Sequence, residues 1–407
     1  MQPFTLLIKP SGSDCNIDCR YCFYKDRSPQ YGRGKQRMSD EVLAKLVKDY
    51  MQLGFPVAGF AWQGGEPTLM GVDFFKRAVE LQKEYGTPGQ QVSNTLQTNA
   101  VLLDEKWCRF FHDNKFLLGI SIDGPKEFHD RYRVDRGGAG TFDRVMRGIG
   151  NCKKHHVEFS ALVLLNNHNV RQPERLFDFL IEDDMTYVQF IPCVETDPRR
   201  FASPATSSDD ESRGGWQKRS SGGKVADFSI TPQQYGEFLC KMFDLWHDHG
   251  PEKVNIRDFD SIVTYFVLDN HTICTYNRLC AGFVVIEHTG EAFCCEFFVE
   301  PQWRIGNLLN TPLEQLAKSR KNRQFAQLKK NLPGKCLVCQ HLDICRGGCL
   351  KDRVRCTGAT SGQNYFCESY KQFFDYSLPR FMQIAAAIRA GTAERHTRSA
   401  ETIRLRI

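Results

Sequence analysis

The chain has 407 residues, enough for two or three domains of ordinary size with a large buried core. Its 17 cysteines, about one residue in 24, are too many for core packing alone, and the chain is too long for a small disulfide-rich secreted scaffold. The net charge of +6 comes from 54 basic and 48 acidic residues that are interspersed, so it does not indicate a nucleic-acid surface. Metal or redox chemistry is therefore the leading interpretation.

The sequence carries no signal for export or for membrane insertion. The apolar run at residues 4–8 has no basic segment before it and leads directly into a polar loop with cysteines, unlike a signal peptide. The longest apolar runs, such as residues 116–120, are strand-sized and far shorter than the ~18 residues that cross a bilayer. We therefore expect a cytoplasmic protein with neither a membrane partner nor a nucleic-acid partner.

The first half of the chain predicts an α/β fold, a partial (βα)6 TIM-type barrel. Short β-rich runs alternate there with segments of helical period. The expected strands are residues 4–9, 57–62, 91–97, 116–122, 157–165 and 186–191. The first helix should begin after Ser39, with Asp40 and Glu41 at its positive end and an apolar stripe formed by Leu43, Leu46, Val47, Tyr50 and Met51. In such a fold the chemistry lies at the carboxyl ends of the strands.

The second half predicts further segments. Residues 196–230 are rich in Ser, Gly, Arg and Asp and are expected to form a linker between the barrel at 1–195 and a helical connector at 231–273. A cysteine-rich domain should follow at 274–370, and a C-terminal helix with a tail at 371–407.

A cluster of three cysteines follows the first predicted strand. Cys15, Cys19 and Cys22 have the spacing C-x3-C-x2-C, which can ligate three irons of a 4Fe-4S cluster and leave the fourth iron open for chemistry. The alternative is a zinc site, but structural zinc takes four protein ligands and no fourth Cys or His lies nearby in sequence.

This motif, with an aromatic residue before the last cysteine, resembles the radical S-adenosylmethionine superfamily. The second strand ends in Gln63-Gly64-Gly65-Glu66-Pro67, which is similar to the GGEP loop of that family, where glycines let the backbone approach the cofactor. The resemblance implies that S-adenosylmethionine binds the open iron and yields a 5′-deoxyadenosyl radical. It also implies cofactor-binding roles for Tyr21, Gly65, Ser121, Arg133 and Val194.

A second group of cysteines lies near the C-terminus. The run from Cys336 to Cys349, with Cys367 after it, would by itself suggest a zinc ribbon. With Cys274, Cys280 and Cys295, however, it resembles the SPASM domain, which holds two fully ligated 4Fe-4S clusters. The resemblance implies one cluster on Cys274, Cys280, Cys295 and Cys349, and another on Cys336, Cys339, Cys345 and Cys367. We expect buried or incidental thiols at Cys108, Cys152, Cys193, Cys240, Cys294 and Cys356.

Several short motifs narrow the resemblance to the anaerobic sulfatase-maturating enzymes. They are Leu7-Ile8-Lys9-Pro10, Tyr21-Cys22-Phe23-Tyr24, Gln63-Gly64-Gly65-Glu66-Pro67-Thr68, Leu96-Gln97-Thr98-Asn99, Ser121-Ile122-Asp123-Gly124-Pro125 and Asn364-Tyr365-Phe366-Cys367. The resemblance implies oxidation of a Cys or Ser in a Cys/Ser-x-Pro-x-Arg-type segment of a sulfatase to Cα-formylglycine. It also implies three 4Fe-4S clusters and an electron donor such as flavodoxin or ferredoxin.

The same resemblance implies a general base and contacts to the substrate. Glu296 directly follows Cys295 and stands where the family usually has Asp; a carboxylate in a secluded pocket suits a base. If Cys294 were the ligand instead, Cys295 would stand at the position of the acidic residue. The residues that follow would then no longer match the sequence pattern of the family. Tyr24, Gln97 and Asp123 are expected to contact the substrate peptide or the cofactor, and structural hydrogen bonding is their alternative role. Ala100 stands where the family usually has Gly.

Two other functions fit parts of the pattern. The protein could be another SPASM enzyme, one that forms thioether or carbon–carbon crosslinks in a peptide. It could also be a zinc-dependent binding module without catalytic activity. The first would yield crosslinked products without an aldehyde, and the second would give a colourless protein that contains zinc and no iron.

Overall fold

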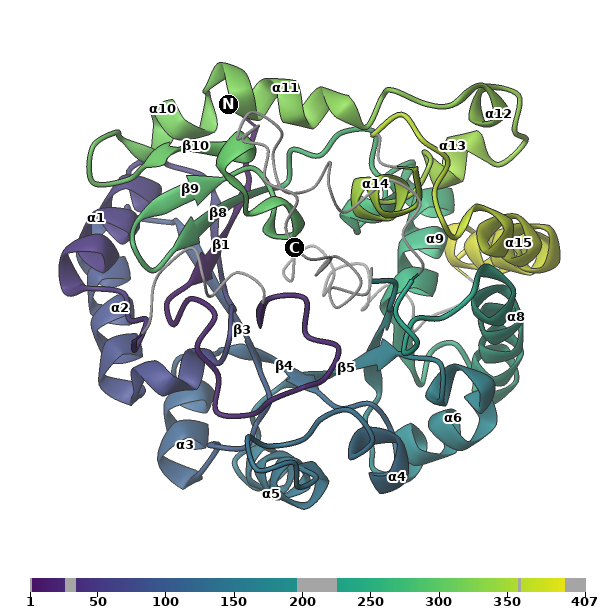
Figure 1. Ribbon diagram of the computed structural model, residues 1–407, viewed down its shortest axis with the longest axis horizontal. Coiled ribbons are helices and arrows are strands. Elements are labelled where there is room, and N and C mark those ends of the chain that lie inside the picture. The colour runs from purple at the N-terminus through teal and green to yellow at the C-terminus, as the bar shows by residue number, and fades with distance from the viewer. Residues whose placement is uncertain (1, 26–33, 196–224, 358–359, 392–407) are drawn as a thin grey trace, which may run out of the picture. The chain divides into compact units, whose positions relative to one another are not determined.

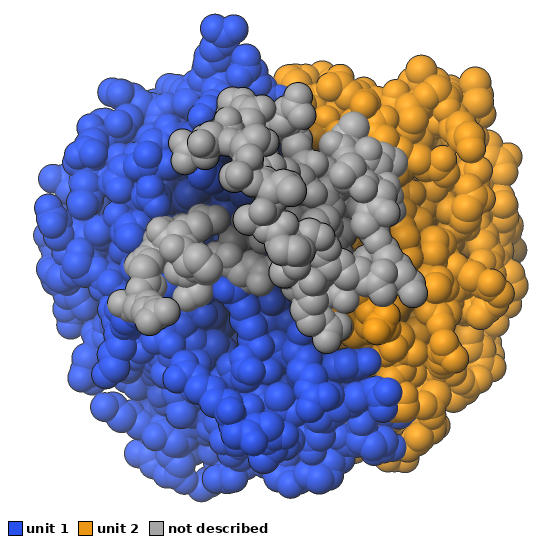
Figure 2. Space-filling model, in the orientation of Figure 1, with its two compact units in different colours: residues 1–122, 126–162, 281–326 blue, residues 123–125, 163–280, 327–407 orange. Residues whose placement is uncertain are grey.

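The computed structural model describes residues 2–25, 34–195, 225–357 and 360–391, with side chains omitted at 354–357. The chain divides into two compact units (Figure 2). Unit 1 comprises residues 1–122, 126–162 and 281–326, and unit 2 comprises residues 123–125, 163–280 and 327–407. Most of the predicted linker at 196–230 and the predicted tail beyond 391 lie outside the described residues, and the predicted domain boundaries stay a prediction.

Unit 1 is built on a sheet whose parallel part follows the chain order. The strands β1 (Thr5–Lys9), β2 (Val57–Trp62), β3 (Gln91–Thr98), β4 (Leu117–Ser121) and the first residues of β5 (Phe159–Leu165) pair in sequence, all parallel. They are joined by helices, as parallel strands require; most are largely buried and apolar, whereas β3 is mainly polar and starts at the surface. The predicted α/β class is confirmed (Figure 1).

The other edge of β1 carries strands that the sequence pattern did not predict. β8 (Phe283–Glu287) pairs parallel with β1, and β9 (Glu291–Phe293) and β10 (Arg304–Asn307) then add antiparallel. The sheet is therefore mixed. The pairing also places residues from the cysteine-rich half of the chain directly beside the strand that leads into the first cysteine cluster.

The helices of unit 1 follow the expected amphipathic pattern. In α1 (Asp40–Met51) the side chain of Ser39 accepts a hydrogen bond from the Val42 backbone N–H, and the predicted apolar stripe is buried. This confirms the predicted cap and core face of the helix. The other helices are α2 (Val72–Tyr85), α3 (Glu105–Asp113), α4 (Lys126–His129), α5 (Phe142–Lys154) and α10 (Leu313–Ala317), with α11 (Arg320–Leu328) ending just past the unit boundary.

Unit 2 is mainly helical. Its elements are α6 (Pro173–Glu182), β6 (Tyr187–Pro192), α8 (Pro232–His249), β7 (Asn255–Ile256), α9 (Arg257–Leu268), α12 (Gly334–Leu337), α13 (Leu342–Cys345), α14 (Leu350–Thr357) and α15 (Cys367–Arg389). Aromatic rings hold α8, α9 and α15 together: Phe243 lies 5.8 Å from Phe259 and 4.7 Å from Phe381 between ring centroids. No helix among the described residues is both long and apolar enough to span a bilayer.

Candidate active site and cluster ligands

Cys15, Cys19 and Cys22 lie on one loop after β1, as predicted. Backbone hydrogen bonds hold this loop against the segment after β4: the Asp18 N–H donates to the Val134 carbonyl at 2.7 Å and the Arg20 N–H to the Tyr132 carbonyl at 2.9 Å. Burial raises the pKa of the Cys15 thiol to about 12, and the negative charges of Glu66, Cys19 and Cys22 add to that rise. A thiol whose ionisation is opposed in this way suits a site where bound iron supplies positive charge.

The glycine loop after β2 is fastened to the cysteine loop. The Gly65 N–H donates to the Gly12 carbonyl at 2.7 Å, and the Glu66 N–H donates to the Asp14 carbonyl at 2.9 Å. A Cβ on Gly65 would collide with the Asp14 carbonyl oxygen. Glycine is thus required here by the close approach of two protein backbones, in addition to the approach of a cofactor that the sequence suggested.

Glu66 is fully buried and links three loops at the carboxyl ends of the strands. Its carboxylate accepts hydrogen bonds from Thr98 Oγ1 at 2.8 Å and from the Asn99 N–H at 2.8 Å, besides those from Thr68. Asn99 in turn donates from Nδ2 to Asn16 Oδ1 at 2.8 Å and to the Cys15 sulfur at 3.6 Å. In the sequence, Glu66 and Asn99 stand out only as parts of motifs. The structure shows that they hold the cysteine loop in position.

The structure brings two of the predicted cofactor-binding residues together at the cysteine loop. Arg133 Nη1 donates to the Cys19 sulfur at 3.8 Å, and its guanidinium lies 5.4 Å from the ring centroid of Tyr21. Ser121 is buried at the last position of β4. Val194 is also buried, in unit 2, two residues after β6.

The predicted substrate residues have different surroundings. Tyr24 is buried in unit 1, and its hydroxyl is hydrogen-bonded to Glu287 Oε1. Gln97 is half-buried at the penultimate position of β3. Asp123, in unit 2, is fully buried and accepts a hydrogen bond from the Leu164 N–H at 3.2 Å, while its own carbonyl accepts one from Asn169 at 3.0 Å. These bonds are of the structural kind, and a contact of Asp123 with the substrate peptide or the cofactor stays a prediction.

Glu296 belongs to a cluster of charged side chains at the ends of β1 and β8. Lys9 is 2% exposed, and its Nζ lies 3.9 Å from Glu296 Oε2 and 4.1 Å from the Tyr24 ring centroid. Lys9 and Glu287 are register partners across β1 and β8. Neither Lys9 nor Glu287 is a predicted site residue, because their alignment depends on the unpredicted pairing of these strands.

Cys295 and Cys294 are adjacent in unit 1 but differ in burial. The Cys294 side chain is buried, and its sulfur lies 3.5 Å from the Trp303 carbonyl oxygen. Cys295 is half-buried and directly precedes the short 3-10 helix Glu296–Phe298. The predicted register, in which Cys295 is the ligand, stays a prediction.

The other predicted auxiliary ligands lie in unit 2 and form two groups. Four thiols, those of Cys336, Cys339, Cys345 and Cys367, line one pocket. In the second group, burial raises the pKa of Cys349 to about 12, and the nearby charges of Asp352, Cys274 and Cys280 add to that rise. No group of three or more His, Cys, Asp or Glu side chains in the described part of the chain has the compact arrangement of a single-ion site.

The cysteines without a predicted ligand role are mostly buried. Cys108 on α3 and Cys152 on α5 are fully buried with their sulfurs 3.9 Å apart, and Cys193 is buried after β6. Cys240 is half-buried on α8, and the side chain of Cys356 lies outside the described residues.

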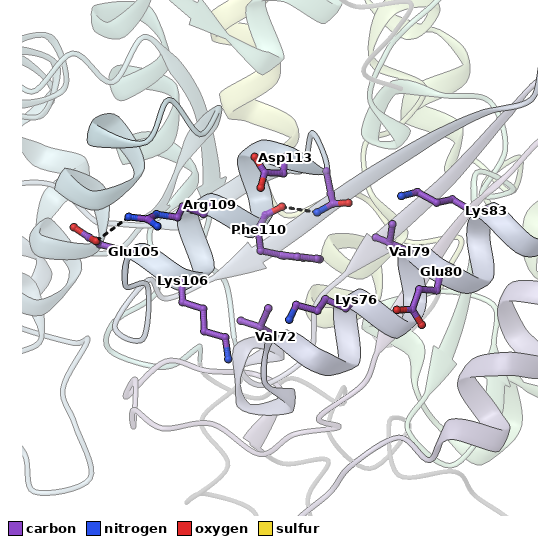
Figure 3. Close-up of a pocket in the computed structure, with 11 residues that line it drawn as sticks. Val72, Lys76, Val79, Glu80, Lys83, Glu105, Lys106, Arg109, Phe110 and Asp113 are labelled. Atoms are coloured by element: carbon purple, nitrogen blue, oxygen red, sulfur yellow. Dashed lines mark hydrogen bonds and ion pairs between the residues drawn. The ribbon is translucent and has the colours of Figure 1, made fainter.

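A separate surface pocket of 610 Å³ lies between α2 and α3 (Figure 3). Its walls carry charges of both signs on long side chains, including Lys76, Glu80, Lys106 and Arg109. None of the predicted site residues lines this pocket, so it is separate from the predicted active site.

Comparisons with known proteins agree with the geometry. The Radical SAM superfamily model matches residues 10–180, and the model of the SPASM iron–sulfur cluster-binding domain matches residues 278–340. The serine-type anaerobic sulfatase-maturating enzyme of Bacteroides thetaiotaomicron is 36% identical over 93% of this chain and 90% of its own length. The cysteine-type enzyme of Clostridium perfringens is 35% identical over 96% of this chain and 100% of its own. A solved structure of native anSMEcpe with bound AdoMet and Cp18Cys peptide matches with a TM-score of 0.83 and 33% identity, covering 95% of this chain and 99% of that one.

Proposed function

The chain belongs to the family of anaerobic sulfatase-maturating enzymes, and we propose how its residues carry out that reaction. It is a radical S-adenosylmethionine oxidoreductase that converts a cysteine or serine of a sulfatase to Cα-formylglycine (3-oxoalanine) after translation and without oxygen. The observation that carries this conclusion is the 36% identity to a sulfatase-maturating enzyme over 93% of the chain. Its cofactors are S-adenosylmethionine and 4Fe-4S clusters.

We assign the first cluster to Cys15, Cys19 and Cys22. When bound, the cluster and S-adenosylmethionine supply the radical that removes a hydrogen atom from the substrate Cβ. The protein contributes position: Asn99 and Arg133 donate hydrogen bonds to the sulfurs of Cys15 and Cys19. Hydrogen bonds to sulfur ligands are also a means of tuning an iron–sulfur centre.

We assign the role of general base to Glu296. Its carboxylate takes the proton from the substrate thiol or hydroxyl, and the buried ammonium group of Lys9 at 3.9 Å holds it in place. Tyr24, Gln97 and Asp123 are proposed to contact the substrate peptide, and the Tyr24 ring lies against Lys9. Tyr21, Gly65, Ser121, Arg133 and Val194 are proposed to bind the cofactor.

The auxiliary cysteines are proposed to bring the total to three 4Fe-4S clusters. One cluster would be held by Cys336, Cys339, Cys345 and Cys367, whose thiols line one pocket. The other would be held by Cys274, Cys280 and Cys349, with Cys295 as the fourth ligand that the family resemblance implies. Fully ligated clusters suit electron transfer. We further propose a flavodoxin or ferredoxin as electron donor, and the reducing cytoplasm as the compartment, because exposed thiolate clusters do not persist in oxidising surroundings.

The test is product analysis with the reduced enzyme, S-adenosylmethionine and two peptides, one with Cys-x-Pro-x-Arg and one with Ser-x-Pro-x-Arg. We expect an aldehyde, trapped by a hydrazine reagent, from at least one peptide, and none from a matched Ala-x-Pro-x-Arg peptide. Hydrogen loss with a crosslink and no aldehyde would instead identify a crosslinking enzyme. A colourless protein with zinc and no iron would contradict every cluster assignment.

A further inference from the structure

A buried lysine lies among the auxiliary cysteines of unit 2. Lys329 is 1% exposed, and its ammonium group donates hydrogen bonds to the backbone carbonyls of Cys274 at 2.6 Å and Thr275 at 2.7 Å. Within the parts of the chain that the structure describes, no carboxylate lies within ion-pair distance of Lys329. Lys351, which is also buried there, differs because Asp352 pairs with it at 2.5 Å. The positive charge of Lys329 is therefore compensated by carbonyl dipoles and by the cysteines around it.

Arg353 fixes the backbone that carries Lys329. This arginine is fully buried and donates to the carbonyls of Lys329 at 3.0 Å, of Arg346 at 2.9 Å and of Gly347 at 2.9 Å, with longer bonds to two further carbonyls. Arg346 and Gly347 lie between the predicted ligands Cys345 and Cys349. The lysine is thus held at a set position relative to the cysteine loops of unit 2.

Burying an unpaired ammonium group costs several kcal/mol unless an anion lies close by. The side chains of Cys280, Cys349 and Cys274 lie within electrostatic range of the buried Lys329 ammonium group. These three cysteines are predicted ligands of one cluster. The arrangement therefore suits a site that carries lasting negative charge, as thiolate-ligated iron–sulfur clusters do.

Oxidation of the substrate creates a need for an electron acceptor of suitable potential. Taking a cysteine or serine side chain to the thioaldehyde or aldehyde removes two electrons and two protons. One hydrogen atom leaves to the cofactor-derived radical, one proton leaves to the base, and one electron remains. A fixed positive charge beside an acceptor favours its reduced, more negative form, and this effect is strong where water is excluded.

We propose that Lys329 would raise the reduction potential of an auxiliary cluster held by Cys274, Cys280 and Cys349, and would so favour its use as the acceptor of the remaining electron. An external protein carrier would then accept that electron from the cluster. This inference rests on the proposed assignment of those cysteines as ligands. Lys329 acts as a tuning residue here and does not touch the substrate.

The experiment measures midpoint potentials by EPR-monitored redox titration. The full chain carries Cys15→Ala, Cys19→Ala and Cys22→Ala, so that only auxiliary clusters contribute to the signal. Lys329→Met and Lys329→Gln remove the charge, and Lys329→Arg retains it. Lys330→Met is the matched control, because Lys330 is the next residue and is exposed. Iron and sulfide analysis accompanies each titration.

We expect the neutral variants to disfavour reduction of one cluster about tenfold, which is ~59 mV for a one-electron couple. Lys329→Arg and Lys330→Met should retain the parent potential. An unchanged potential in a neutral variant with full iron content would overturn the proposal. So would loss of iron in both neutral variants, or an equal shift in Lys329→Arg, since either would make the role of Lys329 structural. Absence of auxiliary iron in the parent protein would instead refute the ligand assignment itself.

Discussion

The two cysteine-rich regions differ in what surrounds their sulfurs. Around Cys15 and Cys19, side chains from other loops donate hydrogen bonds to the sulfur atoms themselves, from Asn99 and Arg133. In unit 2 four thiols line one pocket together with the rings of Tyr370 and Phe374, and buried cations there bond to backbone carbonyls. The first region thus has three thiols on one loop that other loops hold in place, whereas the second encloses one set of four thiols in a pocket.

This difference matches the two proposed roles, radical chemistry in the first region and electron transfer in the second. A three-thiol loop leaves an iron position open for a cofactor, and so its geometry depends on neighbouring loops such as those joined by Glu66. A four-thiol pocket needs no outside ligand, and metal binding there contributes directly to folding. Changes in the first region should therefore affect activity, and changes in the second should affect stability.

The largest effect is expected from Cys19→Ala. Loss of one of only three ligands should remove the first cluster, lower the iron content by about four atoms per chain and abolish 5′-deoxyadenosine formation. Iron analysis and chromatography of the nucleoside product test this. Cys240→Ala, at a half-buried cysteine with no assigned role, is the matched control and should retain both iron and activity.

Glu296→Gln should separate radical formation from product formation. Removing the base should lower the rate of aldehyde formation by about 10²-fold or more, while cleavage of S-adenosylmethionine continues. Glu291→Gln is the control, because Glu291 lies five residues earlier and pairs with Arg304 at 2.7 Å. If both variants made aldehyde at the same rate, Glu296 would not be the base.

Cys345→Ala should act mainly on the stability of unit 2. Burial raises the pKa of the Cys345 thiol to about 12, and Cys367, Cys336 and Cys339 add to the rise, so these four thiols form one electrostatic group. We expect loss of about four iron atoms and a fall in unfolding free energy of ~3 kcal/mol or more, with 5′-deoxyadenosine formation retained. Denaturant unfolding under anaerobic conditions measures this, and unchanged stability would contradict the pocket assignment.

A smaller effect on the unfolding free energy is expected in unit 2, and it should depend on pH. Burial raises the pKa of Asp260 on α9 to about 8, and Asp258 adds to that rise. The native state then holds a proton that the unfolded chain loses above about pH 4, so stability should fall as pH rises from about 4 to 8. Asp260→Asn should raise stability at pH 8 by ~1–2 kcal/mol and flatten this dependence. Thermal unfolding at pH 5 and 8 tests it, with Glu237→Gln on the exposed face of α8 as control.

The smallest effect is expected beside the first region, at Ala100. Its φ of 58° is left-handed, a conformation that glycine adopts without strain. Ala100→Gly should therefore raise the unfolding free energy by ~0.5 kcal/mol, after the loss of a buried methyl group is included. Ala44→Gly, in the middle of α1, should lower it by ~1 kcal/mol. Denaturant midpoints distinguish the two signs, and destabilisation at both positions would contradict the strain argument.

The local sequence pattern was sufficient to predict much of the secondary structure. The strands expected at 4–9, 57–62 and 91–97 appear as β1, β2 and β3 with ends within one residue. In β1 and β2 the reason is that buried parallel strands are short apolar runs between turn residues, whereas β3 is mainly polar. The helix expected after Ser39 begins there, since its cap and apolar stripe are local features. The C-terminal helix expected within residues 371–407 begins earlier, at Cys367, where no side chain caps its first turn.

The sequence by itself determined the chemistry of this protein: cysteine spacing, the GGEP loop and the acid after Cys295 are local motifs that can be read without a fold. Only the tertiary structure decided what these motifs contact. Lys9 is aligned with Glu287 because β8 pairs with β1, and its ammonium group lies near Glu296. Lys329 contacts Cys274 across more than fifty residues of chain. Contacts between residues so far apart arise from the packing of whole elements, and packing depends on the combined burial of many side chains, which no single motif encodes.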